Sequence, residues 1–465
     1  MNNIDWKRIE FVYFLGIGGI GMSALARYFL AEGKQVAGYD RTSTLLTDAL
    51  RSEGMEIHFQ DDLSCIPDFV REPANKNSTV IVLTPAIPAG HQELEYFRSN
   101  GYPILKRSQV LGLLTRNHTT YGVAGTHGKT TTSSILAFIL HTAQRNCTAF
   151  LGGISVNFQS NLLLGDPSAP LHEIVVEADE FDRSFLTLFP QAAIITSMDA
   201  DHLDIYGDRD EMQSTYRAFA AQVQATGFLL YKYGLPIGTT HSRQLTYSIT
   251  EKKADYFGAN ITVKDGRYSF DLHTPGYVID ELTLGLPGRH NVENAVAAAG
   301  LALEAGVDPL SVKNALEGYA GVQRRFEYQV RRPSIVYIDD YAHHPEELRA
   351  AILSARELYP GKRITIAFQP HLFTRTRDFA DGFAESLSLA DTVYLLDIYP
   401  ARELPIPGVD SGLLFDKMTI ADKHRVSKEE IIQRLRHSTP QVFMTLGAGD
   451  IDQLVAPIKK LLENA

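Results

Sequence analysis

"HTTYGVAGTHGKTTTSSILAFILHTA", residues 118–143, reads as a strand of β-branched and aromatic residues, then a glycine turn, then a long helix. Glycines at positions 125 and 128 are followed by Lys129 and Thr130, where the helix begins. Backbone amides and a lysine suit the β- and γ-phosphates of a nucleoside triphosphate, and a hydroxyl suits its Mg²⁺. Val123 stands where the usual GxxxxGK[ST] pattern has its first glycine. We therefore expect a more compact GTxGKTT loop than that of an ordinary motor ATPase or GTPase.

An earlier glycine turn, GIGGIG at residues 16–21, has the same strand, turn and helix setting. Gly16, Gly18 and Gly21 satisfy GxGxxG, and Asp40 ends the next strand at the distance expected of a ribose-binding carboxylate. Such a turn holds a diphosphate with its backbone amides and the helix dipole. A nicotinamide dehydrogenase or another dinucleotide-binding module is therefore one alternative. The second phosphate loop weighs against it, because a dehydrogenase does not need one.

The whole chain alternates short apolar strands with amphipathic helices, which predicts an α/β fold with parallel sheets covered by helices. Its 465 residues are too many for one ordinary core. We expect a Rossmann-like domain at 1–108, a central P-loop ATPase-type domain with a mixed or parallel sheet at 109–322, and a C-terminal Rossmann-like α/β domain at 323–465. Short alternating strands between about 245 and 285 predict an antiparallel edge or side sheet.

Acidic residues gather after two predicted strands of the central domain, in IVVEADEFD at 174–182 and MDADHLD at 198–204. Ligands of α/β sheets bind at the carboxyl ends of the strands, and Mg²⁺ prefers oxygen ligands. The two clusters therefore predict a metal site beside the phosphate loop. The candidate side chains are Glu177, Asp179, Glu180, Asp182, Asp199, Asp201, His202 and Asp204.

Charge and cysteine content narrow the class of protein. A net charge of -11 argues against a general nucleic-acid or membrane-surface binder, because that affinity comes mostly from many Lys and Arg side chains. Cys65 and Cys147 fit neither a disulfide framework nor a CxxC metal site, and no apolar run approaches the ~18 residues that span a bilayer. The start of the chain lacks the pattern of a signal peptide. We expect a cytoplasmic protein that is a monomer or weak homodimer, with no nucleic-acid or membrane partner.

Motifs along essentially the whole chain resemble those of the Mur ligase family of peptidoglycan synthesis, in the same order. They are GIGGIGMSALA, AGTHGKTTT, VEADEFDRSF, DADHLDIYG, LPGRHNVENA, QRRFE, DDYAHHP, QPHLFTRTRD and LGAGDI. The resemblance is greatest to the alanine-adding branch. It implies a three-domain ligase that uses ATP and Mg²⁺ to join L-alanine to the lactyl carboxylate of UDP-N-acetylmuramate through an acyl phosphate. The turn at 16–21 would then hold the UDP diphosphate, and the loop at 125–130 would hold ATP.

The resemblance also implies roles for individual residues. The sugar nucleotide would contact Gly18, Gly19, Ile20, Gly21, Asp40, Thr84, Arg107 and His127. ATP would contact Gly125, Thr126, Gly128, Lys129, Thr130, Thr131, His290, Asn291, Asn294, Arg325 and Asp340. Mg²⁺ ligands would be Thr130, Glu177 and His202; the amino acid would contact Tyr341, His343, Arg375 and Arg377. Catalytic roles would belong to Lys129, His202 and Arg375.

Two departures from the family pattern bear on the branch. Leu372 and Phe373 occupy positions where the family commonly has Arg and Tyr in QPHRYTRTR, and Arg377 is the candidate to compensate. No lysine occurs from 202 to 231, where other Mur ligases generally have a carbamylated lysine, and this agrees with the alanine-adding branch. His371 is a further substrate-contact candidate, although a lone histidine is more often structural. A murein peptide ligase, which attaches a whole peptide to the same sugar nucleotide, is the second alternative.

Overall fold

The computed structural model describes residues 4, 6–116, 118–166, 169, 172–199, 208–264, 267–401 and 403–464. The chain forms two compact units. The first contains Met1–Phe257 and Val296–Ala315, and the second contains Gly258–Ala295 and Leu316–Ala465. The chain passes from one unit to the other within β13 (Tyr256–Lys264), α9 (Arg289–Glu304) and α10 (Pro309–Gly318).

The first unit begins with a five-stranded parallel sheet in the order β3-β2-β1-β4-β5. Val12 on the central strand pairs with Val36 on one side and Val80 on the other, and four of the five residues of that strand are buried. Its strands are β1 (Phe11–Leu15), β2 (Gln35–Tyr39), β3 (Glu56–His58), β4 (Thr79–Leu83) and β5 (Ile104–Lys106). Its helices are α1 (Ile20–Ala31), α2 (Leu45–Ser52), α3 (Asp68–Arg71), α4 (Gln92–Ser99) and α5 (Arg107–Thr115), with short 3-10 turns at Trp6–Arg8, Leu63–Cys65 and Pro73–Ser78.

The same unit contains seven strands of a ten-stranded sheet, in the order β12-β11-β10-β6-β9-β7-β8. All neighbours in this order are parallel except β7 and β8, which are antiparallel. The strands are β6 (Thr119–Ala124), β7 (Cys147–Ser155), β8 (Ser160–Leu163), β9 (Glu173–Ala178), β10 (Ala192–Ile195), β11 (Phe228–Lys232) and β12 (Arg243–Ser248). The helices are α6 (Lys129–Thr142) and α8 (Arg209–Ala221), with a 3-10 turn η4 at Phe181–Thr187.

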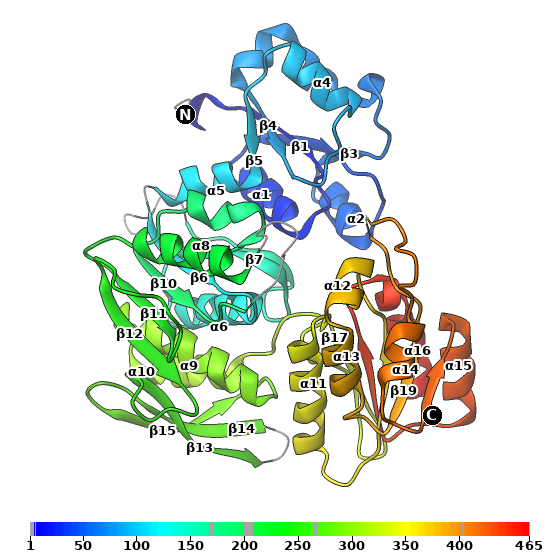
Figure 1. Ribbon diagram of the computed structural model, residues 1–465. Coiled ribbons are helices and arrows are strands. Elements are labelled where there is room, and N and C mark those ends of the chain that lie inside the picture. Colours follow the sequence, from blue (N-terminus) through cyan, green and yellow to red (C-terminus); the bar gives the residue numbers. More distant parts are fainter. Residues whose placement is uncertain are drawn as a thin grey trace. The chain divides into compact units, whose positions relative to one another are not determined.

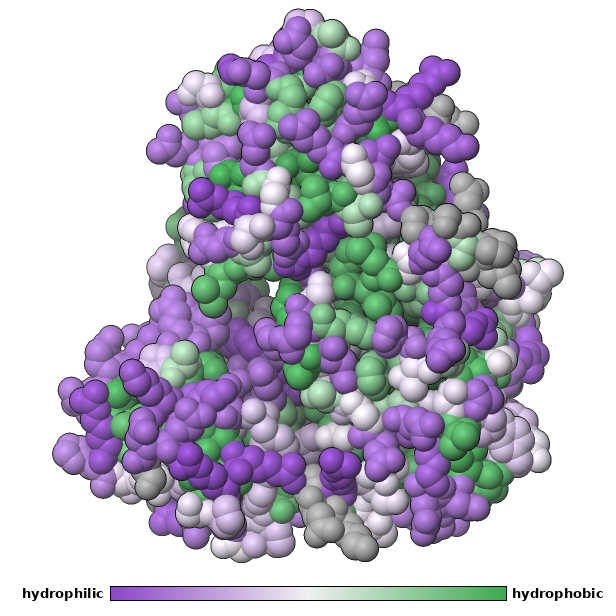
Figure 2. All heavy atoms as spheres, turned by 180° about the vertical axis from the view of Figure 1, so that it is seen from behind, coloured by the Kyte–Doolittle hydropathy of each residue, from purple (hydrophilic) through white to green (hydrophobic). Residues whose placement is uncertain are grey.

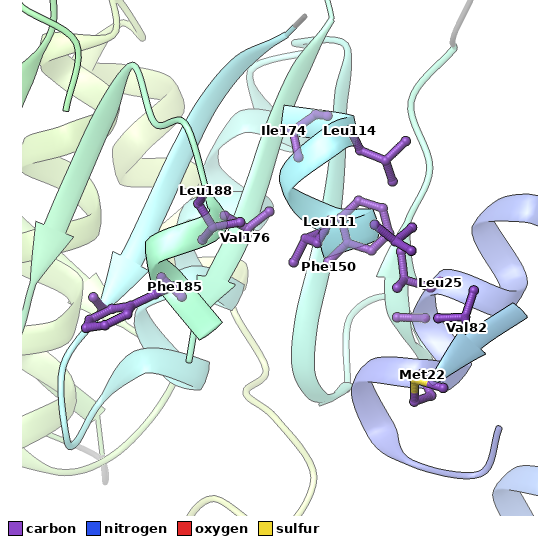
Figure 3. Packing of buried hydrophobic residues seen from close by; sticks show 14 of the residues in the cluster. Met22, Leu25, Val82, Leu111, Leu114, Phe150, Ile174, Val176, Phe185 and Leu188 are labelled. Atoms are coloured by element: carbon purple, nitrogen blue, oxygen red, sulfur yellow. The ribbon is translucent and has the colours of Figure 1, made fainter. Parts of the chain in front are cut away.

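One apolar core joins these two sheets (Figure 3). Met22 and Leu25 of α1 belong to it together with Leu111 of α5, Phe150 of β7 and Val176 of β9. Burying a large apolar side chain stabilises the folded state by about 1.5–3 kcal/mol, so a cluster of this size resists separation of the two sheets. The helix that follows the glycine turn is therefore fixed against the sheet that carries the phosphate loop.

The second unit contains a six-stranded sheet in the order β16-β17-β21-β18-β19-β20, parallel except for β16, which runs antiparallel to β17. Figure 1 labels two of its strands, β17 and β19. The strands are β16 (Glu327–Arg331), β17 (Val336–Asp340), β18 (Ile364–Phe368), β19 (Thr392–Leu395), β20 (Lys423–Arg425) and β21 (Val442–Leu446). The helices are α11 (Pro345–Leu358), α12 (Phe373–Asp378), α13 (Ala380–Leu387), α14 (Gly412–Lys417), α15 (Lys428–His437) and α16 (Val455–Glu463), with a 3-10 turn at Asp450–Leu454. An antiparallel pair, β14 (Arg267–His273) and β15 (Val278–Leu284), also belongs to this unit.

These sheets confirm the predicted α/β class. Between about 245 and 285, β14 and β15 are antiparallel as predicted, whereas β12 and β13 pair in parallel. None of the described helices is both long and apolar enough to cross a membrane. Hydrophilic side chains predominate on the face shown in Figure 2, and hydrophobic ones lie between them.

Candidate active site

The glycine turn at residues 16–21 follows β1 directly. The amides of Gly16 and Ile17 both donate to the carbonyl of Tyr39, at 2.8 and 3.0 Å. Gly16 has a φ of 91°, and a Cβ there would lie 2.4 Å from Cγ2 of Thr84. The chain therefore needs glycine here, because only glycine adopts this conformation without strain and leaves room for the threonine at the end of β4.

Asp40 and Arg107 lie against the same turn. Oδ2 of Asp40 accepts a hydrogen bond from the Gly18 amide at 2.8 Å, and a Cβ on Gly21 would lie 2.5 Å from Nη1 of Arg107. Gly19 caps α1, which begins at Ile20. The structure thus brings together the predicted sugar-nucleotide residues of this turn with Asp40, Thr84 and Arg107. It also shows a contact that the sequence did not predict, since Asp40 orients an amide of the turn.

The phosphate loop at residues 125–130 connects β6 to α6. Gly125 and Gly128 have φ values of 138° and 81°, which favour glycine. A Cβ on Gly125 would lie 2.0 Å from Oγ1 of Thr196, at the end of β10. Thr126 Oγ1 donates to the Asp199 carbonyl at 2.9 Å, and the His127 amide donates to Ser197 Oγ at 2.8 Å. The segment after β10 therefore fixes the shape of the loop.

Lys129, at the start of α6, turns its ammonium group back over the loop. Its Nζ lies 2.7 Å from the Gly125 carbonyl and 2.9 and 2.8 Å from the two carboxylate oxygens of Glu180. Burial lowers the pKa of Lys129, but the carboxylates of Glu180, Asp179 and Glu177 outweigh this effect and raise the pKa overall. Lys129 is therefore a firmly charged cation in a mostly buried site.

Glu177 and Thr130 are the described members of the Mg²⁺ ligand set that the family resemblance implies. Oε2 of Glu177 accepts a hydrogen bond from the Gly152 amide at 3.1 Å, and a Cβ on Gly152 would lie only 2.2 Å from that oxygen. The buried side chain of Thr130 is on the first turn of α6. Hard oxygen donors of this kind fit Mg²⁺. Among the described residues, no group of three or more His, Cys, Asp and Glu side chains could hold a metal ion. The predicted ligand His202 lies outside them, as do Asp201 and Asp204.

Two contacts that the sequence did not predict link the glycine turn with the second sheet of the first unit. Nη2 of Arg107 lies 3.5 Å from Oδ2 of Asp179, which directly precedes Glu180. Asn161 on β8 is fully buried and donates to the Ile20 carbonyl at 2.5 Å and to Oγ of Ser23 at 2.9 Å. A buried amide with these partners is costly to replace, so it fixes the start of α1 against β8.

In the second unit, the predicted adenine-end residues lie at the start of α9. Asn291 donates to the Pro287 carbonyl at 2.6 Å and lies 3.3 Å from Nδ2 of Asn294, so it supports the turn before the helix. Burial lowers the pKa of His290 to about 4, with Arg325 also lowering it and Glu347 opposing. His290 is therefore neutral at pH 7.

Asp340 ends β17 and holds two backbone segments together. Its Oδ2 accepts from the Phe326 amide and its Oδ1 from the Ala342 amide, both at 2.7 Å. Burial raises the pKa of Asp340 to about 6, although Arg325 and these two amides oppose the shift. The guanidinium group of Arg325 lies 5.2 Å from the centre of the Tyr341 ring, a cation–π distance. Asp340, Arg325 and Tyr341 thus form one cluster, which brings two predicted ATP residues together with a predicted amino-acid residue.

The predicted amino-acid residues fall into two groups. His343 lies beside Tyr341, with ring centres 5.2 Å apart, and burial lowers its pKa with help from Arg375. Arg375 on α12 is itself buried. Arg377, by contrast, is half exposed and donates to the neighbouring Asp378 at 2.7 Å. Leu372 caps α12 with a φ of 71°, an unusual conformation for a leucine.

Three family models match the chain in order. The Mur ligase family catalytic domain matches residues 11–119, the Mur ligase middle domain residues 123–302, and the Mur ligase glutamate ligase domain residues 324–449. The UDP-N-acetylmuramate–L-alanine ligase of Porphyromonas gingivalis is 51% identical over 456 residues, which cover 97% of this chain and 99% of that protein.

Solved structures agree with this match. The UDP-N-acetylmuramate-alanine ligase of Thermotoga maritima has a TM-score of 0.81 at 27% identity, with 98% of this chain and 99% of that chain covered. A murein peptide ligase from Psychrobacter arcticus shares the fold, with a TM-score of 0.70 at 22% identity and the same coverage. Because similarity to the first relative extends over nearly the full length of both proteins, the chain belongs to the Mur ligase family.

Proposed function

We propose that this protein is an ATP-dependent ligase that joins L-alanine to the lactyl carboxylate of UDP-N-acetylmuramate and releases ADP and phosphate. The observation that carries the proposal is the presence of two different phosphate-binding loops in one packed unit. The glycine turn has a carboxylate and an arginine beside it, and the phosphate loop has a charged lysine with a metal-type carboxylate nearby. A reaction that needs both a nucleotide-linked substrate and a nucleoside triphosphate requires this pair. The 51% identical relative carries the name of this activity.

In the proposed assignment, the glycine turn binds the UDP diphosphate. The amides of Gly18 and Gly21 and the dipole of α1 attract the phosphates. Asp40 fixes the Gly18 amide and lies close enough to the turn to reach a ribose, and the Arg107 cation lies beside Gly21. The other proposed contacts of the sugar nucleotide are Thr84, Gly19, Ile20 and His127.

The phosphate loop binds ATP in this proposal. Amides at 125–131 and the ammonium of Lys129 contact the phosphates, while Thr130 and Glu177 supply oxygen ligands for Mg²⁺, with His202 as the further predicted ligand. Mg²⁺, when bound, would neutralise charge on the phosphate oxygens. In the second unit, His290, Asn291, Asn294, Arg325 and Asp340 are the proposed contacts of the adenosine end.

Tyr341, His343 and Arg375 are the proposed L-alanine residues. A planar guanidinium group suits a carboxylate because it can donate two parallel hydrogen bonds, and the buried position of Arg375 makes it the stronger candidate. Nδ1 of His343 lies 2.9 Å from the Tyr341 carbonyl, which can only accept, so this nitrogen carries the hydrogen. Nε2 is then free of a proton in the neutral ring and can accept one from the amino acid's ammonium group.

The chemistry follows from the poor leaving group of a carboxylate. An oxygen of the lactyl carboxylate attacks the γ-phosphorus, ADP leaves, and an acyl phosphate forms. The neutral amine of L-alanine then attacks the acyl carbon, and the tetrahedral intermediate expels phosphate as the amide forms. Both steps concentrate negative charge, so the positioned cation Lys129 stabilises them more than it stabilises the ground state.

The test is ADP and phosphate formation by the purified protein. We expect it to require ATP, UDP-N-acetylmuramate and L-alanine together. Release with a peptide but not with L-alanine would assign the chain to the murein peptide ligases, and a change in nicotinamide fluorescence on binding would favour a dehydrogenase. We propose a cytoplasmic place of action, where ATP is supplied, and we propose separately that the protein is a monomer or weak homodimer. The domain division at 108 and 322 belongs to the same proposal.

A further inference from the structure

Glu180 holds the cation of the phosphate loop more closely than the sequence suggested. Both of its oxygens lie within 2.9 Å of Lys129 Nζ, and its side chain is almost completely buried. Within the part of the chain that the structure describes, Nζ also contacts the loop's own carbonyls, at 2.7 Å from Gly125 and 3.4 Å from Thr126. An ammonium group has three hydrogens. All three are therefore engaged by the loop and by Glu180.

Three carboxylates act on this one ammonium group, so negative charge exceeds positive charge around it. Glu180, Asp179 and Glu177 all raise the pKa of Lys129 through their charge. Burial raises the pKa of Glu180 to about 7, although the Lys129 ammonium opposes the rise. At pH 8 a triphosphate approaching Lys129 therefore meets three negative groups and must compete with Glu180 for the ammonium. Charges that are only partly exposed to water interact strongly, because the effective dielectric constant is well below that of water.

We propose that Glu180 is a positioning residue that makes nucleotide binding dependent on a divalent cation, by holding Lys129 until a metal-neutralised phosphate group replaces it. The inference rests on the proposed role of the 125–130 loop in binding ATP. Metal-free ATP carries about four negative charges and its Mg²⁺ complex about two, so Glu180 repels the first more than the second. Lys129 is accordingly available to MgATP and largely withheld from ATP alone.

The test compares the affinity for ATP in EDTA with that in Mg²⁺, by isothermal titration calorimetry. In Glu180→Gln the amide keeps the shape and one acceptor oxygen but loses the charge. We expect the affinity for metal-free ATP to rise about tenfold, and the affinity for MgATP to change by less than about threefold. Glu180→Asp keeps the charge and should keep the wild-type ratio of the two affinities.

Glu173 provides the matched control. It begins β9, is buried, and pairs with Arg145 at 2.6 Å, so Glu173→Gln also removes a buried carboxylate from a cation. We expect it to lower thermal stability and to leave both affinities unchanged. Equal loss of both affinities in Glu180→Gln, or an unchanged ratio, would overturn the proposal and leave Glu180 a structural residue.

A second variant keeps the test decisive if Glu180→Gln does not fold. Lys129→Met should weaken MgATP binding at least about thirtyfold but metal-free ATP binding less than about threefold, since Lys129 is withheld from the latter. Equal losses would contradict the inference. Turnover of the wild-type protein with UDP-N-acetylmuramate and L-alanine tests the proposed function separately, because none of these binding measurements uses either substrate.

Discussion

Replacing Glu93 with Gln should remove a pH dependence from the stability of the N-terminal sheet. The Glu93 side chain is fully buried, and its Oε2 lies 2.7 Å from Oη of Tyr13. The same Oη lies 2.7 Å from Nε2 of His58, whose Nδ1 lies 2.9 Å from the Gln60 carbonyl. A carbonyl can only accept, so His58 Nδ1 carries a hydrogen. The single hydroxyl hydrogen of Tyr13 can then serve only one of its two neighbours.

The neutral form of this cluster can satisfy the three contacts that join Glu93 Oε2, Tyr13, His58 and Gln60. While Glu93 is ionised, Tyr13 donates its hydrogen to Oε2 of Glu93. Once Glu93 is protonated, the carboxyl group can donate to Tyr13, Tyr13 to Nε2 of His58, and His58 to Gln60. Both pKa shifts agree with this form: burial raises the pKa of Glu93 to about 7, with the Tyr13 hydrogen bond opposing and Asp61 adding to the rise, and burial lowers the pKa of His58. With Glu93 ionised and His58 neutral, two lone pairs would face each other in a buried site.

The size and sign of the effect follow from linkage. The rise from an ordinary pKa of 4.5 to about 7 corresponds to about 3 kcal/mol at 1.36 kcal/mol per pKa unit. Between pH 4.5 and 7 the folded protein keeps a proton on Glu93 that the unfolded chain has lost. This proton therefore stabilises the fold fully below pH 4.5, and its contribution is lost as the pH rises to about 7.

Urea unfolding at pH 5, 6, 7 and 8 measures the effect. Trp6 is the protein's only tryptophan and stacks on Phe29 of α1 with ring centres 5.0 Å apart, so its fluorescence reports on this part of the chain. Relative to Glu93→Gln, the wild type should lose about 2.5 kcal/mol between pH 5 and 8, because part of the full effect is already lost at pH 5. Glu95→Gln is the control, because Glu95 lies on the same helix but is half exposed and pairs with Arg98. Parallel pH profiles of wild type and Glu93→Gln would refute the shared-proton arrangement.

Three further changes test the proposed sites. Lys129→Ala should abolish ADP formation while calorimetry finds UDP-N-acetylmuramate affinity within about threefold of wild type, since the glycine turn lies elsewhere; equal loss of both would contradict the assignment. Gly21→Ala should raise KM for the sugar nucleotide about tenfold, because the added Cβ would lie 2.5 Å from Arg107. Gly19→Ala is the control: the nearest atom to its Cβ would be 3.6 Å away, so KM should change little in the same assay. In initial-rate measurements, Arg375→Ala should raise KM for L-alanine at least about thirtyfold, and Arg377→Ala should raise it less than about threefold. The reverse order would make Arg377 the ligand of the L-alanine carboxylate.

Local chemistry explains which parts could be predicted from the sequence. Gly16, Gly125 and Gly128 have positive φ values that a strand-to-helix turn requires, and their spacing is visible in the sequence. The apolar strands β1, β9 and β18 are long enough to show a pattern. By contrast, β3 and β20 have three residues each, too few for any periodicity to appear. The capping box of α15, Ser427 with Glu430, is a local signal that is visible in the sequence.

Most of the site contacts that the sequence did not predict join residues that are far apart in the chain. Asn161 bonds to Ile20 across 141 positions, and Glu180 reaches Lys129 across 51. Both depend on how strands are ordered in the sheets, and strand order cannot be read from one sequence by periodicity. The acidic cluster at 177–182 was identified, but its members have separate tasks: Glu177 contacts a glycine amide, Asp179 faces Arg107, and Glu180 holds the lysine.

A carboxylate beside each group of donors is the common feature of the proposed sites. Asp40 orients the Gly18 amide, Glu180 holds the Lys129 ammonium, and Asp340 accepts from two amides at the end of β17. Buried donors without partners destabilise a fold, so groups shaped to bind phosphate need an acceptor within the protein. A carboxylate satisfies them and fixes their direction, but its charge also opposes the phosphate that must follow. Tight binding then depends on cations near the phosphates. Because these carboxylates repel negative charge, the affinity for the nucleotide depends on the charge that the nucleotide itself carries.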